Sequence, residues 1–337
     1  MTVRHACVIV LRQDGEKTRR ALMEAELLAA GLKIRSDDMY LYIPVQPHVS
    51  MAILDTVAPG LTLAEREFEE TVQRKSIKDL IGFAPSYEII GDIAITAHAY
   101  DRSVCDAIMK AHRNVKTVLE PVSGVAGEFR VREFRVLCGE NRTITTHKEH
   151  GFTYEMDLAK VYFSPRLSTE RKRVIDQVGD SELVVDMFAG VGPFAIQAAK
   201  RAMYVVAVDK NPDAIEYLNK NIRANRVENI EAICADAREI WLRQPADRAI
   251  MNLPHSAHEF LDKAFSLIRT GGIIHYYDIR PEGEIFDAVV RMVRENASKS
   301  GCLIEIVNKR IVRSYSPHEY NIVLDIRVTG KRENFED

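Results

Sequence analysis

The segment that most restricts the fold spans residues 182–194 and reads ELVVDMFAGVGPF. Its apolar run LVV is typical of a short strand buried on both faces of a sheet. Gly190 and Gly192 follow at once, and the apolar residues after them fit the start of a helix packed on that sheet. The segment therefore predicts the first strand–loop–helix unit of a nucleotide-binding domain, in which glycines let the backbone approach a bound group.

The loop does not fit the two common phosphate-binding patterns. The third glycine of G-x-G-x-x-G is missing, and no Lys-Ser/Thr pair is present for a P-loop. Asp186 ends the strand, where a carboxylate would meet an amine, and Asp209 ends the next apolar run, where it suits a ribose diol. A plain glycine turn with solvated acids is the alternative for this segment alone, but the full D-x-F-x-G-x-G string resembles motif I of the class I S-adenosylmethionine-dependent methyltransferases.

Composition narrows the class of protein. A chain of 337 residues with 46% hydrophobic and 28% charged content predicts two or three globular domains. No apolar run reaches the roughly 18 residues of a membrane span, and the N-terminus lacks a signal-peptide pattern. The five cysteines lie too far apart for a metal knuckle or a disulfide framework. We expect a cytoplasmic monomer with no membrane contact and no metal.

The order of apolar runs predicts three parts: 1–62, a small α/β module; 70–165, an α+β region; and 166–337, a doubly wound, mainly parallel sheet with an antiparallel last strand. In the first part CVIVL, MYLYIPV and MAIL look like strands and residues 17–30 like a helix, and the charged residues 60–78 fit a hinge or short helix. In the second part GEFRVREFRVLCG places Arg130 and Arg132 on one strand face, where they could meet phosphates.

Four polar residues stand at successive strand ends of the third part. In an open α/β sheet such residues point into one crevice, and here they are Asp186, Asp209, Asp236 and Asn252. The Asn252 amide offers a donor and an acceptor to the edge of a nucleobase, and Pro254 stiffens the backbone that holds it. Each residue alone could equally be a helix cap or turn residue.

Several long motifs extend the resemblance over residues 79–328. These are GEFRVRE, ENRTITTHKEHG, KVYFSPRLSTER, VVDMFAGVGPF, IMNLPHSAHEF, GGIIHYY and RSYSPHEY. Together they resemble the archaeal and eukaryotic tRNA (guanine-N1) methyltransferases that act at position 37, and the first sixty residues resemble the small accessory domain of the archaeal members. The resemblance implies S-adenosylmethionine as cofactor, tRNA as partner and an RNA-binding middle region.

The resemblance also implies residue roles. Glu170 would be the general base, Arg130 would steady charge on the guanine oxygen, and Asn252 with Pro254 would orient the base. The cofactor would meet Tyr162, the backbone of Arg171, Phe188, Gly190, Gly192, Asp209, Lys210, Asp236, Ala237 and Asn252. The chemistry needs such groups, because N1 of guanine carries a proton that a carboxylate must remove while negative charge spreads to the neighbouring oxygen.

Three alternatives remain open from the sequence. A related enzyme could transfer the aminocarboxypropyl chain of the same cofactor; the Asn252-Leu253-Pro254 tripeptide and the context of Glu170 favour methyl transfer instead. A tRNA-binding protein with a vestigial pocket is the second, although all the pocket residues are of a usable type. A dehydrogenase is the third and weakest, since Phe194 or Ala195 replaces the last glycine of its fingerprint.

Overall fold

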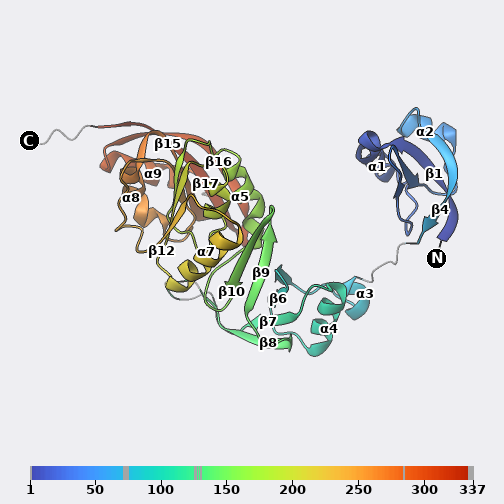
Figure 1. The fold of residues 1–337 in the computed structure, drawn as a ribbon, viewed down its shortest axis with the longest axis horizontal. Helices are drawn as coiled ribbons and strands as arrows, with labels where there is room; N and C mark the ends of the chain where they lie inside the picture. The colour runs from blue at the N-terminus through green and yellow to red at the C-terminus, as the bar shows by residue number, and fades with distance from the viewer. Residues whose placement is uncertain are drawn as a thin grey trace, which may run out of the picture. The chain divides into compact units, whose positions relative to one another are not determined.

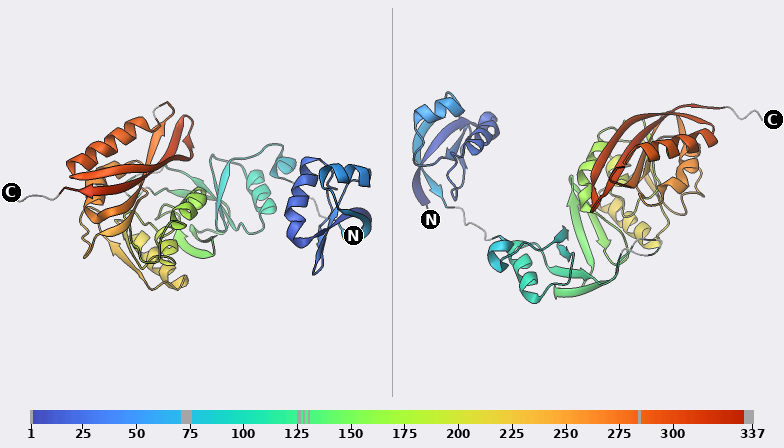
Figure 2. Two further views of the ribbon diagram at one scale, coloured as in Figure 1. Left: turned by 90° about the horizontal axis from the view of Figure 1, so that it is seen from above. Right: turned by 180° about the vertical axis from the view of Figure 1, so that it is seen from behind.

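The computed structural model describes residues 2–70, 76–124, 127, 129, 131–283 and 285–332. The chain forms two compact units, Met1–Asp79 and Leu80–Asp337, which are described separately (Figures 1 and 2). The boundaries of the three predicted parts stay a prediction. No helix within the described residues has the length and apolar character needed to cross a membrane.

The first unit is a four-stranded sheet with two short helices. The strand order is β2-β3-β1-β4. The elements are β1 (Thr2–Leu11), η1 (Arg12–Asp14), α1 (Gly15–Glu24), β2 (Arg35–Ser36), β3 (Tyr40–Pro44), α2 (Met51–Val57) and β4 (Thr62–Glu69). A core of aliphatic residues that includes Val8, Leu22, Ile43 and Leu54 lies between sheet and helices.

Two expectations for this unit are wrong, and the predicted helix is confirmed with different bounds. The MAIL run belongs to α2, in which Leu54 is the only buried residue. The helix predicted over residues 17–30 begins at Gly15 and ends at Glu24. Residues 62–69, expected in a hinge or short helix, form β4, which pairs antiparallel with β1. Because β4 is an edge strand with one fully buried side chain, Phe68, its acidic residues face solvent and hide the strand pattern.

The second unit begins with a mixed sheet. The strand order is β5-β6-β7-β8, with α4 against it, and a separate hairpin pairs β9 with β10. The helix α3 (Ile77–Ile81) contains the boundary between the units. The elements that follow are β5 (Tyr87–Ile90), β6 (Ile93–Thr96), α4 (Arg102–Ala111), β7 (Thr117–Pro121), β8 (Phe134–Gly139), β9 (Ile144–Glu149) and β10 (Phe152–Asp157). Gly91 turns between β5 and β6 so close to β9 that a Cβ would lie 2.4 Å from the Thr146 carbonyl oxygen.

Two asparagines at the end of α7 (Pro212–Ala224) cover the free edge of β10. Asn225 accepts from the backbone nitrogen of Thr153 at 2.8 Å and donates to its carbonyl at 2.7 Å. Asn221 does the same for Glu155, at 2.7 and 3.0 Å, and also donates to the carbonyl of Val191 in the glycine loop. These side chains therefore join the hairpin to the nucleotide-binding unit.

The rest of the second unit is built on a seven-stranded sheet, ordered β13-β12-β11-β14-β15-β17-β16. The first five strands are parallel, and β17 and β16 are antiparallel, which confirms the predicted fold class. The strands are β11 (Leu183–Asp186), β12 (Tyr204–Asp209), β13 (Ile230–Cys234), β14 (Ala246–Met251), β15 (Ile268–Pro281), β16 (Cys302–Ser316) and β17 (Glu319–Lys331).

Helices cover both faces of this sheet (Figure 2). On one face pack α5 (Ser168–Ile175), α6 (Ala195–Ala199) and α7, together with the β9–β10 hairpin. On the other pack η3 (Ala257–Phe260), α8 (Leu261–Leu267) and α9 (Asp287–Lys299). Successive residues of β11 alternate between the two cores, as a strand buried on both faces requires.

Candidate active site

The glycine loop joins β11 to α6. Gly190 and Gly192 have φ of 54° and 91°, in the left-handed region that favours glycine. A Cβ on Gly192 would lie 2.4 Å from Cδ1 of Leu218 on α7, so a larger residue would require that side chain to move. At Gly190 the nearest atom would be the carbonyl oxygen of Tyr162, at 3.8 Å, and this places the Tyr162 backbone beside the loop.

Asp209 braces that loop from the end of β12. Its Oδ2 accepts from the backbone nitrogen of Gly190 at 2.7 Å, and its Oδ1 accepts from that of Asn211 at 2.9 Å. Burial raises the pKa of Asp209, and these hydrogen bonds oppose the rise without cancelling it. The carboxylate is therefore held rigidly at the edge of the loop.

Asp186, at the end of β11, is buried and incompletely bonded. Its Oδ1 accepts from the nitrogen of Phe188 at 3.4 Å, whereas its Oδ2 is buried without a hydrogen-bond partner among the described residues. Burial raises the pKa of Asp186 to about 7, and the neighbouring Asp209 adds to the rise. A buried acid that lacks a partner is suited to receive a cationic donor from a ligand.

Asp236 and Lys210 lie together at the ends of β13 and β12. Asp236 accepts from the backbone and guanidinium of Arg238 at 2.8–3.0 Å, and Lys210 Nζ lies 3.5 Å from it. The hydrogen bond from Arg238 is the main cause that lowers the pKa of Asp236. Ala237, the next residue in the chain, is buried, and this part of the site holds one carboxylate with two cations bonded to it.

An aromatic pair borders the glycine loop. The rings of Phe188 and Phe260 meet edge to face with centroids 5.0 Å apart, and the guanidinium of Arg238 lies 4.8 Å from the centre of the Phe260 ring. Phe260 was not expected from the sequence, although it stands in the IMNLPHSAHEF motif.

Asn252 follows β14, whose neighbours are β11 and β15. Its Oδ1 is buried and lacks a hydrogen-bond partner among the described residues, like Oδ2 of Asp186. Asp186 pairs in register with Ile250, two residues before Asn252, so both unbonded oxygens belong to neighbouring strand ends. Pro254 lies in the turn that follows, where Ser256 donates its backbone N–H to the carbonyl of Leu253.

Arg171 on α5 has a buried side chain with structural contacts. Its guanidinium donates to both oxygens of Glu149 on β9, at 2.7 and 2.5 Å, and to the carbonyl of Ser164. Gln197 on α6 donates to the same Glu149 at 2.9 Å. Only the backbone of Arg171 is thus left for the ligand role that the resemblance implies.

Glu170, the preceding residue, is 4% exposed and ion-paired. Arg173 donates to it through Nε and Nη2, the shorter contact being 2.7 Å, and the hydroxyl of Tyr277 donates to its Oε1 at 2.9 Å. Tyr277 lies on β15 and its ring centroid is 6.1 Å from that of Phe194, at the end of the glycine loop. Glu170 is therefore connected to the loop through one aromatic contact.

A cavity of about 330 Å³ opens between the mixed sheet and the loop that precedes α5. It includes Tyr162 and three arginines, Arg132, Arg166 and Arg313, and Arg166 lies 2.6 Å from Glu88. Its volume is at the lower end of the range typical of ligand pockets. Arg166 and Arg313 were missed from the sequence, because single arginines before a helix or on an edge strand carry no local signal.

The structure thus brings the predicted residues into two groups. One surrounds the glycine loop and contains Tyr162 (through its backbone), Phe188, Gly190, Gly192, Asp209, Lys210, Asp236, Ala237 and Asn252. The other is the ionic cluster of Glu170. Arg130 lies outside the described residues, and the side chain of Arg171 points into neither group.

Three family models match the chain in order. Residues 7–53 match the tRNA methyltransferase 5 N-terminal domain, residues 68–143 the TYW2 N-terminal domain, and residues 145–306 the TRM5/TYW2 methyltransferase domain. The chain is 43% identical to the tRNA (guanine(37)-N(1))-methyltransferase Trm5b of Pyrococcus abyssi, covering 94% of this chain and 97% of that protein.

Solved structures agree with this match. The complex of aTrm5 with tRNALeu is 38% identical with a TM-score of 0.68, and the match covers 96% of this chain and 99% of that one. TYW2 of M. jannaschii in complex with AdoMet is 32% identical with a TM-score of 0.58, and the match covers 72% of this chain and 100% of that one. With the fold, the glycine loop and a relative matched over nearly its whole length, the chain belongs to the TRM5/TYW2 methyltransferase family.

Proposed function

We propose that this chain transfers a methyl group from S-adenosylmethionine to N1 of guanosine 37 in tRNA. The observation that carries the proposal is the pair of buried, unbonded oxygens of Asp186 and Asn252 at adjacent strand ends. One is suited to a ligand amine and the other to a donor on a base edge. The names of the full-length relative and of the tRNA complex support the choice of substrate.

The residues around the glycine loop fit the cofactor. Asp186 has an acceptor available for the amino group, and Asp209 stands where a ribose diol would bind. Asp236 and Ala237, with Phe188 nearby, would hold the adenine, and Tyr162, Lys210 and the backbone of Arg171 complete the set that the resemblance implies. The bound cofactor supplies an electrophilic methyl group; the protein orients it and excludes water.

In this proposal Glu170 removes the proton from N1 of guanine. Its Oε1 accepts from both Tyr277 and Arg173, whereas its Oε2 receives one hydrogen bond, from Arg173 Nε at 3.0 Å. Oε2 is therefore the oxygen with a lone pair left for the N1 proton. Asn252 and Pro254 orient the ring, and Arg130 stabilises the negative charge that develops on the guanine oxygen.

We also propose that tRNA contacts extend beyond this site, to the module of residues 1–62 and the middle region of residues 70–165. The cavity with Arg132, Arg166 and Arg313 supports a role for the middle region, because phosphate contacts dominate tRNA affinity. A base that reacts at N1 must also leave its stack to reach Glu170.

The test is incubation of the protein with unmodified tRNA and S-adenosylmethionine, followed by digestion and identification of the nucleoside and its position. We expect 1-methylguanosine at position 37. An aminocarboxypropyl adduct would establish the rival transferase, and cofactor binding without any product would favour a non-catalytic tRNA-binding protein. Either result would overturn the proposal.

Replacing Asp209 with Ala should weaken cofactor binding. The ribose would lose hydrogen bonds to a charged acceptor, a loss of about 1.5–3 kcal/mol, and the Gly190 amide would lose its brace. Titration calorimetry with S-adenosylhomocysteine measures the change, with Asp213→Ala as control, because Asp213 binds Lys160 on the surface. Unchanged affinity in Asp209→Ala would contradict the assignment.

Cofactor affinity should depend on pH through Asp186. Its pKa is about 7 in the free protein, so below pH 7 the acid is protonated and must lose that proton to bind an ammonium group. Affinity should therefore fall by up to about tenfold per pH unit as the pH drops below 7. The same titration in Asp186→Asn should be flat over this range, and a slope that survives the substitution would exclude Asp186 as its source.

A further inference from the structure

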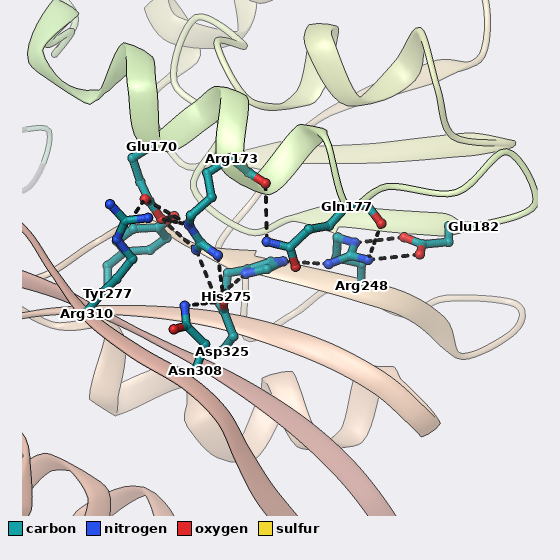
Figure 3. Close-up of polar contacts among 10 residues, drawn as sticks. All are labelled: Glu170, Arg173, Gln177, Glu182, Arg248, His275, Tyr277, Asn308, Arg310 and Asp325. Atoms are coloured by element: carbon teal, nitrogen blue, oxygen red, sulfur yellow. Dashed lines mark hydrogen bonds and ion pairs between the residues drawn. The ribbon is translucent and has the colours of Figure 1, made fainter.

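The carboxylate proposed as general base belongs to a chain of buried polar groups that the reaction itself does not explain. Figure 3 shows the guanidinium of Arg173 between two carboxylates, Glu170 on its own helix and Asp325 on β17. Arg173 donates to Asp325 through Nη1 at 2.6 Å and Nη2 at 3.1 Å, and to Glu170 at 2.7–3.1 Å. One cation thus pairs with two acids. Glu170 is three residues from Arg173 in the chain, and Asp325 is 152 residues from it.

Water does little to screen these charges. The side chains of Glu170 and Asp325 are 3% and 4% exposed, and that of Arg173 is 18% exposed. Charge–charge interactions at such sites are much stronger than on the surface. The number of positive charges available to the two carboxylates therefore decides how strongly each holds a proton.

His275 does not supply a second cation. Its Nε2 lies 2.7 Å from Nη1 of Arg248, which can only donate, so Nε2 accepts and Nδ1 carries the hydrogen that is donated to Asp325 at 2.6 Å. Burial lowers the pKa of His275, in agreement with a neutral ring. Arg248 in turn is paired with Glu182 at 2.7 and 2.9 Å.

The remaining groups that face the two carboxylates add little positive charge. Asn308 on β16 donates to Asp325 at 2.9 Å and is neutral, and Tyr277 on β15 donates to Glu170. Arg310 on β16 is 4.0 Å from Oε2 of Glu170, but its side chain is 44% exposed and water weakens its effect. Among the residues that the structure describes, the polar groups bonded to or paired with Glu170 and Asp325 are Arg173 from α5, His275 and Tyr277 from β15, and Asn308 and Arg310 from β16.

The two carboxylates differ in their capacity to accept a proton. Each oxygen of Asp325 accepts two hydrogen bonds, from His275 and Arg173 on one and from Arg173 and Asn308 on the other. Burial raises the pKa of Asp325, but the hydrogen bonds from His275 and Arg173 outweigh it and lower the pKa overall. Oε2 of Glu170, with one hydrogen bond, is the open position of the pair.

We propose that Asp325 is a positioning residue for catalysis, which makes Glu170 a stronger base by sharing the positive charge of Arg173. With Arg173 paired to Glu170 alone, that carboxylate would resist protonation. Asp325 competes for Arg173 and so reduces the stabilisation of the ionised Glu170 carboxylate. When Glu170 takes up the guanine proton, Asp325 remains as the counter-ion of Arg173, so that no buried cation is left unpaired. This inference rests on the proposed role of Glu170 as general base.

The experiment is the pH dependence of the single-turnover methyl-transfer rate in the full chain with its tRNA. The wild-type rate should rise with pH as Glu170 loses its proton, and this rise should disappear in Glu170→Gln. In Asp325→Asn, Arg173 pairs with Glu170 alone, so the rise should move to lower pH, with a slower plateau. Asp325→Glu, which keeps the charge, should restore the wild-type profile.

Glu182→Gln is the matched control. It makes the same carboxylate-to-amide change in the same network, but on a group bonded to Arg248 instead of Arg173. Its profile should match the wild type. If Asp325→Asn does not fold, as judged by thermal unfolding and cofactor binding, Asp325→Ser removes the same charge with a smaller side chain.

Two outcomes would overturn the inference. A wild-type pH profile in Asp325→Asn, or in Asp325→Ser, would show that the shared guanidinium does not set the basicity of Glu170. An equal shift in Glu182→Gln would show that any buried negative charge acts in the same way. A rise that persists in Glu170→Gln is a different failure, since it removes Glu170 as the base and leaves this inference without its premise.

Discussion

Replacing Glu170 with glutamine is expected to slow single-turnover methyl transfer by about 10²–10⁴-fold, the usual contribution of a general base. Glutamine keeps the size of the side chain and still accepts from Tyr277, but it cannot take a proton from N1. Rapid-quench measurement with saturating enzyme isolates the chemical step from product release.

Affinity measurements show whether a slower rate in Glu170→Gln comes from the chemical step or from a change in structure. Affinities for S-adenosylhomocysteine and for tRNA should change little in Glu170→Gln, since glutamine keeps the size of the side chain and an oxygen that accepts hydrogen bonds. A tRNA with adenosine at position 37 should be a poor substrate for the wild type, because its exocyclic amino group offers Arg130 a donor where guanine offers an acceptor, even though its N1 carries no proton. A normal rate on guanosine in Glu170→Gln would exclude Glu170 as the base.

Replacing Arg171 with methionine should lower the free energy of unfolding of the second unit by about 3–5 kcal/mol, since it leaves Glu149 buried without its cation. Both side chains are nearly fully buried, at 2% and 3% exposed. Burial raises the pKa of Glu149, and the hydrogen bonds from Arg171 and Gln197 outweigh it, so the native state depends on the carboxylate being paired. Urea unfolding followed by circular dichroism measures the loss.

The adjacent Lys172 provides the control. It pairs with Asp176 on the surface, with side chains 58% and 50% exposed, so Lys172→Met should change the free energy of unfolding far less than Arg171→Met does. The double variant Arg171→Met with Glu149→Leu should recover much of the stability, because two apolar side chains leave no buried charge. Equal losses in Arg171→Met and Lys172→Met would contradict the argument.

The parallel sheet could be predicted because each of its strands is a short apolar run buried on both faces. The polar residue after each run then marks the strand's end, and Asp186, Asp209 and Asn252 do lie at ends of neighbouring strands. The same logic failed in β4, where only Phe68 is fully buried and the charged residues face solvent. A strand at the edge of a small sheet lacks the pattern on which the prediction depends.

The ionic cluster could not be predicted, because its members have no common local pattern. Arg173, three residues after Glu170, resembles an ordinary partner on a helix surface. Its second partner, Asp325, is in a strand formed near the end of the chain, and only the packing of α5 on β15 and β17 brings them together. For Arg171 the resemblance predicted a backbone contact with the cofactor, and nothing in the sequence indicated that its side chain would bond to Glu149.

The asparagines that cover β10 also affect whether another molecule can pair with the edge of this strand. A two-stranded hairpin normally exposes a row of backbone donors and acceptors to which another chain can add a strand. Here the edge groups of Thr153 and Glu155 are already taken by the carboxamides of Asn225 and Asn221. The outer edge of β10 is thereby protected from intermolecular strand pairing without a proline or lysine in the strand itself, and the protection lasts only while α7 remains folded against it.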